Sequence, residues 1–231
     1  MSYQIHLSKD KKFAKLLEAQ ELLSIRKRKN LCTYLVGSIT SQQLSVKVAA
    51  VIYQRFLDIY EGKEPSAQQI IDTPADKLRS IGLSNAKTQY VLNVARFAIE
   101  QGMELEKIAK MDNEEVIAYL TQIKGVGRWT VEMLLMFALG REDVFALDDL
   151  GIQNAMIGIY KISREDKKKF KKDMLRISAK WSPFRTFACM HLWQWKDNSP
   201  EAKPKTKKKA KPAPKKATKK KAAKKKKTSN K

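Results

Sequence analysis

The chain has 231 residues, and its 43% hydrophobic content is enough for a sizeable core in one compact unit or two small lobes. Its 47 Lys and Arg residues outnumber 24 Asp and Glu residues, and a net charge of +23 favours polyanionic partners. Two cysteines, Cys32 and Cys189, are too few for a disulfide framework or a four-cysteine iron–sulfur site, so we expect both to be buried, reduced thiols.

Apolar residues recur at helical spacing along the chain up to about residue 198. Two helices are predicted early, and their apolar faces comprise Leu44, Val48, Val51, Ile52, Phe56 and Ile59, then Val91, Leu92, Val94, Ala95 and Ala98. Thr73 followed by Pro74 predicts a helix start, and Asp112 with Glu115 predicts a capping box. Because no convincing alternating strand pattern occurs, the sequence predicts an all-α fold.

A glycine turn and a pair of aspartates flank the most informative helix. Gly125 and Gly127 let the backbone turn tightly and aim N–H groups at an anion, which is a way to bind DNA backbone without reading its sequence. The helix predicted from about Arg128 to Leu139 is apolar over a wide face, so we expect it to be buried between two lobes. Asp148 and Asp149 follow in a loop, where they can begin the next helix.

Four blocks of the sequence carry a resemblance to a known family. They are GVGRWT followed by DVF and the paired aspartate before LG; LVGSITSQQLSVKVAAVIYQRF at 35–56; IGLSNAKTQYV at 81–91; and WSPFRTFACMHLW at 181–193. In this order they resemble the helix-hairpin-helix DNA glycosylases, and most of all the 3-methyladenine glycosylase II branch. The resemblance spans roughly residues 30 to 195, which is far more specific than a lone glycine turn.

The resemblance implies two helical lobes with a cleft between them. We expect a glycosylase core at 1–200, with a central lobe over roughly 30–125 and the N-terminal residues packing with residues 126–198. Residues 201–231 form a tail with sixteen lysines between Lys203 and Lys231, which leaves a net charge of +7 for the rest of the chain. We expect the tail to be disordered, because it has little to bury, and to bind DNA nonspecifically. A solubilising or artefactual tail is the alternative.

Asp149 matches the essential aspartate of the family's motif, so the resemblance makes it the catalytic residue. A helix N-terminus favours its ionised form, and the anion would stabilise an oxocarbenium-like transition state, or orient or deprotonate water. An N-cap is the simpler role for an aspartate here, and the two roles are compatible. Trp129 stands where lyase-competent relatives carry the amine nucleophile, so the resemblance implies a monofunctional enzyme without lyase activity.

The resemblance also places Trp129 and Trp193 in a base pocket, where an aromatic face stabilises a positively charged methylated purine by about 2 kcal/mol. Met133, where some relatives carry a further aromatic, and Asp148 complete the expected base-binding set. Core packing is the alternative role for both indoles. Around the glycine turn, the expected contacts to the DNA backbone are Lys124, Gly125, Gly127 and Arg128.

A base inside a duplex must be flipped out before it can be cut, and a wedge then fills the gap. The loop containing Gln42, Gln43 and Leu44 matches the family's wedge region, although Leu44 is equally consistent with a core residue. His6 and His191 lack metal-ligand spacing, so we expect no catalytic metal and no cofactor. The resemblance allows only a structural monovalent cation at the hairpin turn.

The leading interpretation is a DNA glycosylase that hydrolyses the N-glycosidic bond of alkylated purines, such as 3-methyladenine and 7-methylguanine, and so begins base excision repair. Its expected partner is double-stranded DNA containing alkylated bases, bound by a monomer. A noncatalytic, chromatin-associated DNA-binding protein and a glycosylase for another damaged base are the alternatives. The sequence shows no signal-like region and no membrane-spanning run, so we expect an intracellular, DNA-associated protein without membrane contact.

Overall fold

The computed structural model describes residues 2–198, and the expected tail at 201–231 lies outside this range. Every regular element within the described residues is helical, which confirms the all-α fold. The elements are α1 Tyr3–Leu7, α2 Lys11–Glu18, α3 Leu31–Ser41, α4 Val46–Asp58, α5 Ala67–Asp72, α6 Ala75–Ser80, α7 Asn85–Glu100, α8 Leu105–Ala109, α9 Asn113–Leu120, α10 Arg128–Phe137, α11 Leu150–Tyr160, α12 Lys167–Ser178, the 3-10 helix η1 Ala179–Trp181, and α13 Arg185–Asn198. No helix among them combines the length and the apolar character needed to cross a bilayer.

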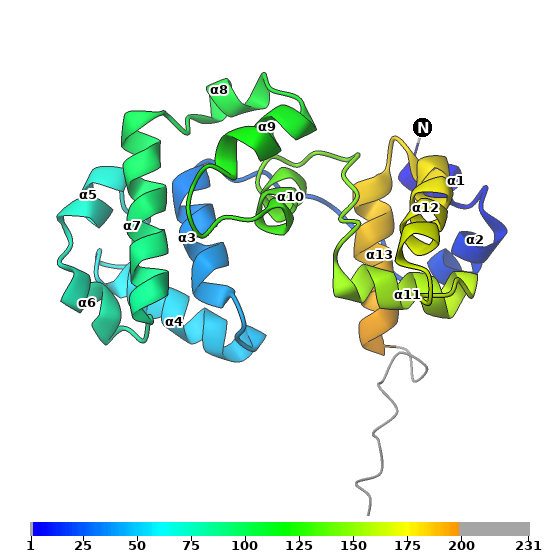
Figure 1. The fold of residues 1–231 in the computed structure, drawn as a ribbon, viewed down its shortest axis with the longest axis horizontal. Coiled ribbons are helices and arrows are strands. Elements are labelled where there is room, and N and C mark those ends of the chain that lie inside the picture. The colour runs from blue at the N-terminus through cyan, green and yellow to red at the C-terminus, as the bar shows by residue number, and fades with distance from the viewer. Residues whose placement is uncertain (1, 199–231) are drawn as a thin grey trace, which may run out of the picture.

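Figure 1 shows two groups of helices side by side, which we call the first and the second lobe. The first lobe contains α3 to α9. Helix α7 packs against α5 and α3, and α3 also packs against α4. The side chains of Leu35, Phe56 and Val91 are fully buried there. This lobe is therefore built around one central helix pair, α3 and α7.

The second lobe joins both ends of the described chain. Helix α13 packs against α11 and α2, while α1 contacts η1 (Figure 1). The rings of Tyr3 and Phe187 stack with centroids 4.1 Å apart, and Phe13 lies 5.2 Å from Trp181. These aromatic contacts pack the N-terminal helices against the C-terminal ones.

Helix α10 lies between the two lobes. Its helix contacts are with α9 and α3 of the first lobe, and the hydroxyl of Tyr34 donates to the main-chain oxygen of Met133 at 3.0 Å. Toward the second lobe, the ring of Phe137 lies 6.0 Å from Trp193. The sequence placed everything after residue 125 with the second lobe, whereas the contacts of α10 attach it to the first.

The local signals at helix ends had mixed outcomes. Asp112 and Glu115 form the expected capping box at the start of α9. A helix begins one residue later than expected at Thr73 and Pro74, but Thr73 is not its N-cap: Thr73 is the C-cap of α5, and its hydroxyl donates back to the Gln69 carbonyl at 2.7 Å. Helix α6 begins after Pro74 without a side-chain cap.

Both cysteines are buried free thiols, as expected. Burial raises the pKa of each thiol to about 12, so neither is a reactive thiolate near neutral pH.

Candidate active site

Asp149 is the N-cap of α11, and its carboxylate is buried. Oδ1 accepts hydrogen bonds from the Ile152 backbone N–H at 2.8 Å and from the Trp193 indole N–H at 2.9 Å. Oδ2 accepts from the Trp129 indole N–H at 2.8 Å. The N-cap role is confirmed, and the same carboxylate joins α10, α11 and α13 at one point.

All three donors to Asp149 are neutral, so its negative charge is oriented without being cancelled by a cation. Each carboxylate oxygen can accept two hydrogen bonds, so Oδ2 retains an acceptor position after binding Trp129. The Trp129 side chain is 45% exposed, whereas Trp193 is half-buried. An indole that is held by its N–H edge and exposed over its ring can present that ring to a bound molecule.

Asp148 does not share this environment. Its side chain is exposed, and Oδ1 lies 2.6 Å from Nζ of Lys171 on α12. The neighbouring aspartates therefore serve different purposes in the structure, one accepting from the two indoles and the other pairing with a lysine. The base-binding role expected for Asp148 has no support from these contacts.

Met133 lies one turn along α10 from Trp129, and its side chain is 8% exposed. A buried methionine at this point can line the bottom of a pocket, but it exposes little surface to a bound base. The indole of Trp193 is also packed closely, because a Cβ at Gly151 would lie 3.0 Å from its Cδ1. A side chain at 151 would therefore require the Trp193 indole to shift.

The glycine turn between α9 and α10 uses its two glycines differently. Gly125 has φ +108°, and a Cβ there would lie 2.3 Å from the ring of Tyr90, so the fold itself requires glycine. Gly127 has an ordinary φ of −99°, and a Cβ there would meet nothing within 4 Å. Gly127 is also the N-cap of α10 and provides no side-chain acceptor, so the first N–H groups of α10 remain available to an anion. Lys124 on this turn is exposed.

Arg128 is committed to two carboxylates rather than presented to a ligand. Its guanidinium donates from Nη1 to Glu114 at 2.9 Å, with a second bond from Nη2, and from Nε to Glu132 at 3.0 Å. These contacts fix the start of α10 against α9. Burial raises the pKa of Glu132 to about 7, although the hydrogen bond from Arg128 opposes that shift. Glu132 is a buried acid that the sequence interpretation did not single out.

The expected wedge loop lies against the glycine turn. Gln42 is half-buried, and its side-chain amide donates to the Gly125 carbonyl at 3.2 Å. Gln43 and Leu44 are exposed, and Gln43 adopts a left-handed conformation with φ +59°. Val46, at the start of α4, is 88% exposed and was not among the expected residues.

Lys87 on α7 holds this loop in place. Its ammonium group donates to the Thr40 carbonyl at 3.0 Å and to the Gln42 carbonyl at 2.7 Å. Partial burial lowers the pKa of Lys87. This role could not be predicted from the sequence, because the two partners lie at the C-terminal end of α3, more than forty positions away.

Two main-chain oxygens of the glycine turn already accept hydrogen bonds. The Lys124 carbonyl accepts from the Asn93 side chain at 3.2 Å, and the Gly125 carbonyl accepts from Gln42. Each of these two oxygens retains a second lone pair beside its hydrogen bond. Elsewhere in residues 2–198, no group of three or more His, Cys, Asp or Glu side chains is arranged to hold a metal ion.

Comparisons with known proteins identify the family of the chain. The model of the HhH-GPD superfamily of base excision DNA repair proteins matches residues 36–180, which is more than half of the chain. The chain belongs to the HhH-GPD superfamily. The matched span includes the wedge loop, the glycine turn and Asp149, whereas Trp193 lies beyond it.

The chain is similar to proteins from two organisms. DNA-3-methyladenine glycosylase 1 of Schizosaccharomyces pombe is 37% identical over 177 residues, covering 76% of this chain and 76% of the relative. A solved structure of the S. pombe 3-methyladenine DNA glycosylase in complex with abasic DNA matches with a TM-score of 0.76 at 33% identity, covering 86% of this chain and 98% of that one. A DNA-3-methyladenine glycosidase structure from Bacillus halodurans has a TM-score of 0.73 at 30% identity, covering 84% and 89%.

Proposed function

We propose that this protein is a monofunctional DNA glycosylase that hydrolyses the N-glycosidic bond of alkylated, positively charged purines such as 3-methyladenine and 7-methylguanine. The observation that carries the proposal is the Asp149 carboxylate, which accepts from the indoles of Trp129 and Trp193 beside a helix N-terminus. The names of the HhH-GPD relatives support the same substrate class. A protein that only bound DNA would not need a buried carboxylate oriented by two aromatic side chains.

The charge of Asp149 supplies the catalytic effect. As the glycosidic bond breaks, positive charge develops on the sugar, and a fixed anion nearby stabilises it. At about 4 Å and an effective dielectric constant of about 20, one unit charge contributes about 4 kcal/mol. That is about a thousandfold in rate. The remaining acceptor position on Oδ2 is the natural place for the attacking water, so electrostatic stabilisation and water activation can both act from this residue.

Substrate selection follows from the aromatic surfaces. A flipped purine that carries a positive charge gains about 2 kcal/mol against an indole face, whereas a neutral base gains less. Trp129, 45% exposed beside the carboxylate, is placed for this contact. Alkylated purines also leave as neutral bases, so the site needs few hydrogen bonds to the base.

We expect hydrolysis by water without a lyase step, because of where the lysine amines near the site lie. A Schiff base needs a lysine amine at the reacting carbon, and position 129 is a tryptophan. The Lys87 amine donates to two carbonyls, and Lys124 is exposed on the glycine turn. Neither lysine contacts Asp149.

The glycine turn binds the DNA backbone through the first N–H groups of α10 and through Lys124. The protein acts as a monomer in the compartment that holds the cell's DNA. Gln43 and Leu44 are the wedge candidates, because Gln42 is already bonded to Gly125. The lysine-rich tail adds nonspecific affinity for DNA. Arg128, paired with two carboxylates, contributes to the position of the turn.

The test is incubation of the full chain with a duplex methylated by an alkylating agent. Released bases are identified by chromatography, and abasic sites by strand cleavage in alkali. Release of methylated purines without borohydride-trapped adducts is the expected result. Binding without base release would instead favour the noncatalytic DNA-binding protein, and a trapped covalent adduct would contradict the monofunctional mechanism.

A further inference from the structure

The net positive charge of residues 1–202 is concentrated in one segment of the sequence. Between residues 161 and 180 the sequence has nine Lys and Arg residues and three Asp and Glu residues. Residues 1–202 carry a net charge of only +7 in total, so this segment accounts for nearly all of it. The segment comprises the loop before α12, α12 itself and the start of η1, and all of its Lys and Arg side chains are exposed.

Intramolecular contacts neutralise little of this charge. The ion pairs recorded between residues 2 and 198 involve only Lys171 and Arg176 from the segment. Asp166 instead accepts backbone N–H groups as the N-cap of α12. The guanidinium of Arg164 donates to two side-chain amides and lies 5.6 Å over the ring of Phe170. The lysines of α12 are therefore available to an external anion.

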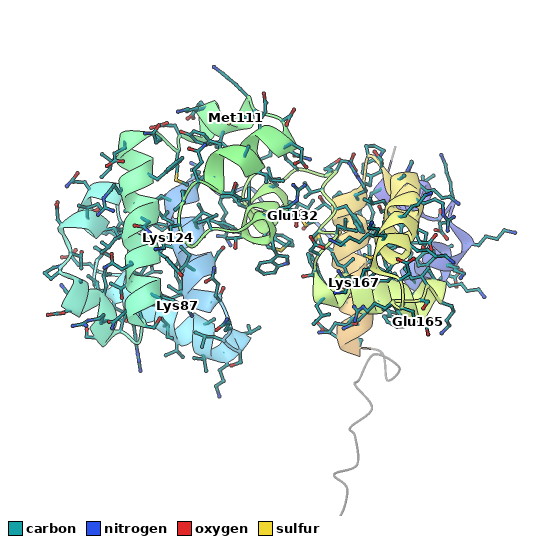
Figure 2. All side chains as sticks on the ribbon, viewed as in Figure 1. Lys87, Met111, Lys124, Glu132, Glu165 and Lys167 are labelled. Atoms are coloured by element: carbon teal, nitrogen blue, oxygen red, sulfur yellow. The ribbon has the colours of Figure 1, made fainter. Side chains whose placement is uncertain are left out.

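One flank of α12 borders the candidate active site. Lys167 and Lys171 lie one turn apart on the same flank of the helix, and Nζ of Lys171 lies 2.6 Å from Asp148. Asp148 directly precedes Asp149. Figure 2 shows Lys124 on the first lobe and Lys167 on the second, with Glu132 of α10 between them. The two basic elements thus lie on different lobes, and the candidate carboxylate lies at their junction.

We propose that the flank of α12 formed by Lys167 and Lys171 is a second phosphate-binding surface, which binds the DNA strand on the opposite side of the flipped nucleotide from the glycine turn. The proposal rests on DNA being the substrate, as in the proposed function. Flipping a nucleotide distorts the backbone on both sides of it, and contacts on both sides hold the distorted strand against Asp149. Asp148 positions Lys171 until a phosphate replaces it.

This exchange is favourable because the Asp148 pair is weak. The two side chains are 61% and 49% exposed, and solvent screens an ion pair of that kind. A DNA phosphate that takes the place of Asp148 also releases a condensed counterion. At low salt, the phosphate contact therefore stabilises Lys171 by more free energy than the loss of the Asp148 ion pair costs.

The test measures the salt dependence of binding to an undamaged duplex, with the full chain and fluorescence anisotropy. Each lysine–phosphate contact contributes about 0.9 to the slope of log K against log salt concentration. The double variant Lys167→Ala/Lys171→Ala is expected to lower that slope by about two. Lys171→Arg should retain the slope, because the guanidinium also binds phosphate.

The matched control is Lys63→Ala/Lys110→Ala, which removes the same charge from exposed lysines of the first lobe. Lys63 also carries an exposed ion pair, with Glu61 at 3.9 Å, so the control resembles Lys171 in that respect. An unchanged slope in the control and a fall by about two in the α12 variant would support the proposal. Equal slopes in both variants would overturn it, whether both fell or neither did.

Base release is measured separately, in single turnover on a methylated duplex at saturating protein. If the wild-type chain released no base, the proposed glycosylase function would fail, while the salt slopes would still decide whether α12 binds phosphate. If base release were normal and the slopes were equal, only the α12 surface would be rejected. Thermal unfolding of each variant checks that the α12 substitutions leave the fold intact.

Discussion

Asp149→Asn tests the candidate catalytic carboxylate with the smallest change in shape. The wild-type side chain accepts three hydrogen bonds, from Ile152, Trp193 and Trp129. An asparagine oxygen can still accept the first two, but its amide N–H groups then face the indole N–H of Trp129. Two donors oppose each other at that contact, so one hydrogen bond is lost.

The two consequences of this change differ in size. An unsatisfied donor costs about 1–3 kcal/mol when it is buried. The Trp129 side chain is 45% exposed and its N–H can turn to water, so we expect a loss of about 1 kcal/mol in the free energy of unfolding. Removing the charge from the transition state costs about 4 kcal/mol, which is about a thousandfold in rate.

The assay is single-turnover release of 7-methylguanine from a defined duplex, with protein in excess of DNA. We expect Asp149→Asn to lower the rate constant about a thousandfold and to leave the affinity for undamaged DNA within about a factor of two. Asp148→Asn is the control, because the indoles do not contact this adjacent carboxylate; with protein in excess, the loss of its pair with Lys171 should leave the release rate near that of the wild type. Wild-type release by Asp149→Asn would refute the catalytic assignment.

Four further substitutions test the surrounding site. Gly127→Ala should leave the free energy of unfolding within about 1 kcal/mol of wild type, yet weaken DNA binding, because the added Cβ enters the space open to the DNA backbone. Gly125→Ala should instead unfold the turn, because the added Cβ clashes with the ring of Tyr90. Similar DNA affinity for Gly127→Ala and wild type would contradict a close backbone approach. Trp129→Ala should reduce release of 7-methylguanine more than release of hypoxanthine, by up to about thirtyfold in their ratio, and equal losses would indicate a packing role alone. Burial raises the pKa of Glu132 from 4.5 in the unfolded chain to about 7, so its protonated form favours the folded state and this contribution is lost as pH rises from 4.5 to 7. The upper bound is about 3 kcal/mol, and roughly 1–2 kcal/mol after solvent screening. Urea unfolding of Glu132→Gln across that range should lack this slope, and an unchanged slope would assign it to another group.

Local patterns predicted the fold well because helices satisfy their backbone hydrogen bonds within one segment. The Asp112 capping box and the Asp149 N-cap were readable because each needs only a few adjacent residues. The pairing of Asp148 with Lys171 and the contacts of Lys87 were not readable, since each joins elements that are distant in sequence. Arg128 shows both cases. Its pair with Glu132, four positions along the same helix, is predictable from the sequence, whereas its pair with Glu114 on α9 is not.

The assignment of α10 to the first lobe has a consequence for how binding and chemistry are coordinated. Gly127 caps α10, and Trp129 lies in its first turn with its indole on Asp149. A helix advances about 1.5 Å per residue, so a phosphate bound at the N-terminus of α10 lies within about one helical turn of Trp129. Because Arg128, between these two residues, anchors the same turn to α9, the distance from the bound phosphate to Trp129 is set by a rigid helix. The second lobe contributes Asp149 itself, so a change in the angle between the lobes would separate the Trp129 and Asp149 side chains before it disturbed the glycine turn. Substitutions that loosen the lobes should therefore lower base release, and should weaken DNA binding only through the loss of the α12 surface on the second lobe.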